Sequence, residues 1–356
     1  MRAALILAAA AGLWAQQPRL TNAKLETRAA AAGLDREFQS LTAAQAGPAW
    51  IGWAVRAVAG EHQMCCYSSF EDGAGNRCCR GCALEGSRGL GAVSAASGPI
   101  PLEASGYIFV LLRFEQHRVD RIRTFSANCE LDGGGLPFYW LNDVKPAESI
   151  ALLSKLALEP DDENRGRHRR SEPAIAAIAL HADPAADQAL ERFIAPSQPE
   201  SLRERTSFWL GSARGRRGFE LLQRLVKEDP SDRVRDKAIF GLSVSPEPAA
   251  VPAMIEVAKN DRSGRVRGQA LFWLAQKAGQ KEVSAITDAI ENDPDTDVKK
   301  KAVFALQQLP AGEGVPLLIQ VARTNKNPAV RKQAMFWLGQ SSDPRAVRFF
   351  EEVLLR

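Results

Sequence analysis

A 32-residue repeat fills the second half of the sequence and constrains its fold more than any other feature. A weaker earlier copy places Ala174 and Ile178 one step before Thr206 and Leu210. Four columns keep the step without insertion: Leu202, Val234, Val266, Val298 and Val330; Phe208, Phe240, Phe272, Phe304 and Phe336; Leu210, Leu242, Leu274, Leu306 and Leu338; and Ala238, Ala270, Ala302 and Ala334. Such a period is typical of chains whose units share one core with their neighbours.

Within one unit the spacing indicates two helices. Val234, Ala238 and Leu242 recur every four residues, and the apolar positions of 219–226 repeat this pattern for a second helix. Polar acceptors between the hairpins predict helix N-caps at Asp229, Asp261, Asp293 and Asn325. One hairpin cannot bury its apolar stripes alone, so neighbours must stack. We predict a mainly α fold in which residues 172–356 form an α-solenoid of about five to six hairpins with an extended concave surface.

The repeat also resembles a known family. The stretch from Asp229 through Val234, Arg235, Ala238 and Leu242 to Val251 and Met254 is similar to the short bacterial HEAT repeat, also called the phycobilisome-lyase-type repeat. The resemblance covers residues about 165–356 and is specific to the fold, because scaffolds, adaptors and a few enzymes share this repeat. It implies that the helices opening with Val-Arg line the concave side.

The enzymes of that family set a test for catalysis. Deoxyhypusine hydroxylase, a HEAT-type enzyme, binds two irons through repeated His-Glu pairs, because such metals need imidazole and carboxylate ligands. No histidine in this sequence is directly followed by a glutamate. The regular array at 197–356 contains no cysteine and none of the four histidines, which are His62, His117, His168 and His181. Nucleophile-elbow and phosphate-binding glycine patterns are also missing. We predict no catalytic residue, no metal site in the array and no cofactor.

Two columns of the array are candidates for binding. Basic residues follow the apolar anchor at Arg203, Arg235, Arg267, Lys299 and Arg331, either as a structural ladder to aspartates or carbonyls of the adjoining unit or as a partner site. Phenylalanines lie six places after the anchor, pointing away from the core stripe, at Phe208, Phe240, Phe272, Phe304 and Phe336. Tryptophans follow them in alternate units, at Trp209, Trp273 and Trp337. These rings form either an exposed partner-binding surface or packing between successive hairpins.

The first half has a different pattern. Helices are predicted at Leu34–Ala44 and Pro146–Leu158, and strands at 50–58, 107–114, 119–125 and 138–141. Asp132 before three glycines signals a turn. We therefore predict a cysteine-rich α+β domain at 16–158 and a linker at 159–171, where prolines and charges accumulate. The basic run Arg165, Arg167, His168, Arg169 and Arg170 falls in this linker and is interpreted as a solvated connector rather than a nucleic-acid site.

All six cysteines lie in this first domain: Cys65, Cys66, Cys78, Cys79, Cys82 and Cys129. An even count in an exported protein favours three disulfides, with Cys65 and Cys66 pairing with the 78–82 cluster and one bridge tying Cys129 to it. The two-residue gap between Cys79 and Cys82 leaves a zinc site and a redox pair open as alternatives.

The first fifteen residues have the features of a secretory signal. Arg2 precedes an apolar run at 3–14, which is shorter than a bilayer span, and Ala15 offers a small residue for cleavage. We expect a periplasmic or extracellular protein without a membrane span. The favoured function is a non-enzymatic scaffold that binds a protein partner, not nucleic acid, through the concave solenoid face. The alternative is thiol-redox or metal-dependent activity in the cysteine-rich domain, with the solenoid selecting the client.

Overall fold

The computed structural model describes residues 17–60, 82–85, 106–127, 129–159, 170–278, 283–309 and 312–355. The predicted signal at 1–15, the side chains of Cys65, Cys66, Cys78, Cys79 and Cys82, and most of the predicted linker lie outside these residues. The chain divides into two compact units, Met1–Ala186 and Asp187–Arg356. The division therefore falls later in the chain than the linker predicted at 159–171.

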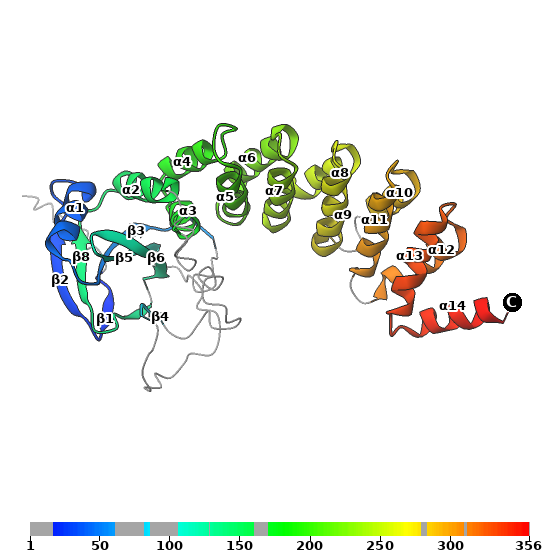
Figure 1. The fold of residues 1–356 in the computed structure, drawn as a ribbon, viewed down its shortest axis with the longest axis horizontal. Helices are drawn as coiled ribbons and strands as arrows, with labels where there is room; N and C mark the ends of the chain where they lie inside the picture. Colours follow the sequence, from blue (N-terminus) through cyan, green and yellow to red (C-terminus); the bar gives the residue numbers. More distant parts are fainter. Residues whose placement is uncertain are drawn as a thin grey trace, which may run out of the picture. The chain divides into compact units, whose positions relative to one another are not determined.

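The described residues of the first unit form two sheets and three helices, which Figure 1 shows. The larger sheet has the order β2-β8-β3-β5-β6, and the smaller has the order β1-β7-β4. The strands are β1 (Arg19–Thr21), β2 (Lys24–Ala29), β3 (Ala49–Arg56), β4 (Cys82–Ala83), β5 (Tyr107–Glu115), β6 (Arg118–Ser126), β7 (Glu130–Asp132) and β8 (Pro137–Asn142). The helices are α1 (Leu34–Ala44), α2 (Pro146–Leu158) and α3 (Ser171–Leu180).

The predicted hairpin and helices of this unit are present. Strands β5 and β6 pair antiparallel, and the residues between them, Gln116 and His117, both adopt positive φ, as a tight two-residue hairpin turn requires. Helices α1 and α2 occupy the predicted residues. The short strands β1, β2, β4 and β7 were not predicted, because β2 is almost wholly exposed and the other three have at most three residues each.

The larger sheet is covered on both faces. Residues 108–112 of β5 are all fully buried, although alternate side chains of a strand point to opposite faces. One face packs with the small sheet around a core of Trp50, Leu84, Phe109, Leu111, Phe125, Cys129, Leu131, Phe138 and Trp140. On the other face, the Trp53 indole donates a hydrogen bond of 2.8 Å to Ser149 of α2. Helix α3 packs against α2 and β6, which explains why it is apolar on all sides.

The second unit is an array of helical hairpins (Figure 1). Its helices are α4 (Ala185–Phe193), α5 (Glu200–Ala213), α6 (Gly215–Glu228), α7 (Asp232–Val244), α8 (Ala250–Asn260), α9 (Gly264–Ala278), α10 (Val283–Asn292), α11 (Thr296–Gln307), α12 (Gly314–Thr324), α13 (Pro328–Gly339) and α14 (Pro344–Leu354). Helices α5, α7, α9, α11 and α13 follow one another as the odd row, and each packs directly on the next. The even row, α6 to α14, packs less closely along its length. The solenoid prediction is confirmed for this part of the chain.

The predicted N-caps were placed two residues too early. Ser231, Asp295 and Asn327 are the residues whose side chains accept hydrogen bonds from the first turns of α7, α11 and α13. Asp229 and its equivalents instead end the preceding even helix and accept the backbone N–H two residues on, as Asp229 does from Ser231 at 2.9 Å. This shift leaves the carboxylates free to bind the arginine column described below.

Glycine allows an unusually close approach of α5 and α7. A Cβ atom on Gly211 would lie 2.0 Å from the Gly241 carbonyl oxygen, and one on Gly241 would lie 2.5 Å from that of Ser207. Any side chain at either position would therefore force the two helices apart.

Among the described residues, no helix is both long and apolar enough to cross a membrane.

Candidate binding surface

The arginine column forms a ladder that joins successive hairpins. Arg235 on α7 binds both carboxylate oxygens of Asp261 at 2.8 and 3.0 Å. Arg203 binds Asp229 in the same way, and Arg267 binds Asp293, always 26 residues further along the chain. The side chains of these pairs are nearly fully buried, so each rung is a charge-assisted, bidentate contact shielded from water.

Each of these arginines also holds the turn before its own helix. Arg235 donates to the carbonyl of Asp229 at 3.0 Å, and Arg267 donates to that of Asp261 at 2.9 Å. Burial lowers the pKa of Arg235, but the hydrogen bond and charge of Asp261 oppose this, and the net pKa is raised. The ladder therefore has the two kinds of partner, aspartate and backbone carbonyl, that its structural interpretation required.

The fourth rung has a different pair of residues. Lys299 replaces arginine, and Asn325 stands at the position of the aspartates, so the bidentate ion pair is lost from both sides at once. Lys299 donates instead to the carbonyl of Glu291 at 2.5 Å, and Asn325 donates to the Glu291 carboxylate at 3.1 Å. Arg331, the last member of the column, donates to the carbonyls of Asn325 and Lys326. This column is engaged inside the array and is not available to a partner.

The aromatic columns form one continuous chain of rings across the odd row, here called the aromatic strip. Phe208 stacks on Phe240 at 5.6 Å between ring centroids, and Phe240 contacts Trp273 at 4.7 Å. The pattern repeats two units later, with Phe272 on Phe304 at 5.9 Å and Phe304 on Trp337 at 4.9 Å. Within α5, α9 and α13 the neighbouring rings meet edge to face: Phe208 with Trp209, Phe272 with Trp273, and Phe336 with Trp337.

The rings of the strip are both packed against one another and partly exposed. Its rings pack between successive hairpins, and yet each phenylalanine keeps part of its surface in solvent on the side of the odd row away from the core. Trp209 is buried, whereas Phe336 is 53% exposed, with Met335 exposed beside it. The indole nitrogens of Trp273 and Trp337 are buried and have no hydrogen-bond partner among the residues that the structure describes. The odd row thus presents a connected, half-exposed aromatic surface over five helices.

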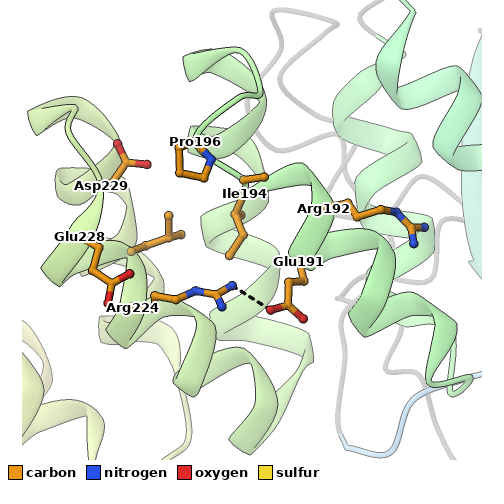
Figure 2. Close-up of a pocket in the computed structure, with 9 residues that line it drawn as sticks. Glu191, Arg192, Ile194, Pro196, Arg224, Glu228 and Asp229 are labelled. Carbon is orange, nitrogen blue, oxygen red and sulfur yellow. Dashed lines mark hydrogen bonds and ion pairs between the residues drawn. The ribbon is translucent and has the colours of Figure 1, made fainter.

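A pocket of about 460 Å³ opens between α4 and α6 (Figure 2). Its wall of Ile194, Pro196 and Leu225 is apolar. Glu191 binds Arg224 across the opening at 2.9 Å, and this hydrogen bond is the main reason that the Glu191 pKa is lowered. This ion pair joins α4 to α6 across the pocket.

The other predicted residues take structural positions. His181 is fully buried between the Ser149 hydroxyl at 2.9 Å and the Ala177 carbonyl at 2.6 Å, and Asp132 accepts the N–H of Gly134 in its turn. Arg170, from the basic run, binds Glu159 at 2.6 Å. Cys129 is buried and disulfide-bonded. The connectivity of the other cysteines stays a prediction.

One cluster near Cys129 was missed from the sequence. Glu85 accepts hydrogen bonds of 2.9 Å from the Trp50 indole and from Arg113, and it lies 3.7 Å from Arg121. These contacts fix residues 82–85 against the sheet, where Leu84 enters the core.

Among the residues that the structure describes, no group of three or more histidine, cysteine, aspartate or glutamate side chains is placed to hold a metal ion.

Comparison with known families decides the nature of the array. HEAT repeats match residues 187–275 and 283–356. This part of the chain consists of HEAT repeats. The match agrees with the resemblance carried by the 32-residue columns, and HEAT arrays are typical of protein-interaction scaffolds. Among curated proteins, none matches the chain.

Three solved structures resemble part of this chain. Human deoxyhypusine hydroxylase in complex with glycerol is 13% identical, with a TM-score of 0.32 over 58% of this chain and 90% of its own. The complex of CpcE and CpcF of phycocyanin lyase from Nostoc is 20% identical, with a TM-score of 0.30 over 56% and 77%. The Escherichia coli protein YibA is 20% identical, with a TM-score of 0.34 over 60% and 71%. At such scores, none of these likenesses extends to activity or partner.

Proposed function

We propose that this protein is an exported, non-enzymatic scaffold that binds another protein through the solvent-facing side of the odd row. The observation that carries the proposal is the aromatic strip, a continuous set of half-exposed rings on the helices of a HEAT array. Aromatic side chains bury large areas at little entropic cost and are enriched at protein interfaces. A surface of this kind suits a protein partner better than a small molecule.

The packing of the rows supports a concave binding side. Successive odd helices pack more closely than successive even helices. Between α5 and α7, Gly211 and Gly241 allow the two backbones to come into direct contact. In a curved array the more closely packed row lies on the inside of the curve. The strip would then line a groove in which one partner can contact several units at once.

Site-specific photo-cross-linking in the cells that produce the protein tests this proposal. A photoreactive amino acid would replace Gln276 or Met335 on the odd row, and Lys259 or Val353 on the even row as matched exposed controls. We expect a discrete adduct with another protein from the odd-row positions only. Adducts of equal yield from both rows, or none from the odd row of a folded protein, would contradict the proposal.

The exported and non-enzymatic parts have their own tests. Fractionation of cells should place the full chain outside the cytoplasm, and deletion of residues 2–15 should retain it inside. Titration of the unreduced protein should find no reactive thiol, and metal analysis should find no bound zinc. Reactive cysteines or stoichiometric metal would favour the alternative, in which the first domain is a redox or metal-dependent module.

A further inference from the structure

Three lysines lie beside the aromatic strip. Lys237 and Lys301 each precede a phenylalanine of the strip by three residues, and Lys332 precedes Phe336 by four, so all three share the helix face of the rings. All three side chains are exposed. None of them forms an ion pair or hydrogen bond with any residue that the structure describes.

The carboxylates of the same face are already engaged. Glu204 lies 3.6 Å from Arg233, Asp236 lies 3.7 Å from Arg265, and Asp297 binds Lys300 at 3.0 Å. Lys237 and Lys301 act on Asp236 only at longer range. The solvent-facing side of the odd row therefore carries a surplus of positive charge interleaved with aromatic rings.

The backbone of α9 positions one of these cations. A Cβ atom on Gly268 would lie 2.3 Å from Cδ of Lys301, so the aliphatic stem of Lys301 crosses α9 where that helix has no side chain. The glycine thus lets a lysine of α11 lie over the neighbouring unit. This placement carries the stem of Lys301 along the row toward the preceding repeat.

We infer that the odd row binds an extended acidic segment of a protein, one that carries apolar side chains between its carboxylates. The carboxylates meet Lys237, Lys301 and Lys332, and the apolar side chains lie on the exposed faces of the rings. This inference rests on the proposed function and specifies the chemistry of the partner. Charge complementarity selects an acidic segment. A segment without apolar side chains would gain no contact with the rings and would bind more weakly.

The repeat sets the spacing of the segment. Helices packed side by side lie about 8–10 Å apart, and an extended chain advances about 3.3 Å per residue, so one repeat corresponds to about three residues. Lys237 and Lys301 are two repeats apart in sequence and Lys332 lies about one repeat further, but the stem of Lys301 reaches back over α9, one repeat nearer to Lys237. The matching segment therefore has carboxylates about three and then about six residues apart.

Fluorescence anisotropy with the full chain tests this directly. The probe is a labelled twelve-residue peptide with glutamates at those spacings and leucine or phenylalanine between them. We expect saturable binding that weakens with added salt and falls about tenfold or more in the K237Q/K301Q/K332Q variant, because three exposed charge pairs are lost. The K227Q/K259Q/K326Q variant makes the same change in net charge away from the strip, and it should bind within about twofold of the natural protein.

The remaining arms separate other outcomes. A peptide with lysine for each glutamate, and one with serine for each apolar residue, should both bind at least about tenfold more weakly. Equal binding of either peptide, no binding of the acidic peptide, or equal loss in the control variant would overturn the inference. So would a single-stranded oligonucleotide that binds as tightly with the same lysine dependence. If odd-row cross-links form while the acidic peptide fails, the scaffold function stands and only the partner chemistry is wrong.

Discussion

Removing one arginine of the ladder should strongly destabilise the array. In Arg235→Met the side chain of Asp261, which is 5% exposed, stays buried, and among the described residues it keeps a hydrogen bond of 2.7 Å from the Ser263 N–H. The substitution also removes the hydrogen bonds that Arg235 donates to Asp232 and to the carbonyl of Asp229. Breaking a buried ion pair from one side costs about 3–5 kcal/mol, and no discount for solvent applies because the Arg235 side chain is 1% exposed.

A double variant identifies the cause of that loss. The double variant Arg235→Met/Asp261→Asn leaves no unpaired buried carboxylate. We therefore expect its loss of unfolding free energy to be smaller, by at least about 1 kcal/mol, than the summed losses of the two single variants. Lys299 and Asn325 show that the chain itself accepts a rung without the ion pair. Arg216→Met removes an exposed ion pair with Glu220 and serves as the control, with a loss below about 1 kcal/mol.

Urea unfolding, followed by circular dichroism and by tryptophan fluorescence, measures these effects. The two signals should be compared, because an array whose units contact only their neighbours can unfold in parts. A loss below about 1 kcal/mol in Arg235→Met, or strict additivity in the double variant, would refute the view that the buried rung joins the hairpins.

Three further predictions concern single side chains. Gly241→Ala should lower the melting temperature by several degrees because of the contact with the Ser207 carbonyl, whereas Gly339→Ala, whose Cβ would meet nothing nearer than 4.0 Å, should not; equal shifts would contradict the close approach. Burial raises the pKa of Asp236 despite nearby cations, so its proton stabilises the fold below that pKa and this contribution is lost as the pH rises. Asp236→Asn should therefore raise the urea midpoint at pH 7, and its advantage should shrink on acidification; a growing advantage would show the wrong sign. Glu85→Gln weakens the contacts of Arg113 and should speed hydrogen exchange at Leu84, and unchanged exchange would mean that Glu85 does not fix this segment.

The array could be predicted because one pattern repeats. Val234, Ala238 and Leu242 mark a helical stripe, and copies at a constant step require stacking, whatever the details of each turn. The partner of Arg235 could be predicted only as a class, aspartate or carbonyl. Its identity depends on where the turn places Asp261, which the predicted N-caps had wrong by two residues.

The candidate surface was only partly predictable. Helical geometry places Phe240 away from the core stripe, but sequence alone leaves open whether its ring packs or is exposed. The structure shows both, because the ring stacks on Phe208 and Trp273 along a row that solvent still reaches. Lys237 and Lys301 were overlooked, although their position one turn before a phenylalanine was a signal for them.

The affinity of the cross-linked partner for two matched variants tests the central claim most directly. Phe336 is 53% exposed on the odd row, and Val353 is 47% exposed on the even row, so changing either to serine removes a similar exposed fraction without entering the core. Surface plasmon resonance with the full chain should show a dissociation constant raised about tenfold or more by Phe336→Ser and unchanged by Val353→Ser. Equal effects of the two substitutions, or no effect of the first, would contradict a binding role for the aromatic strip.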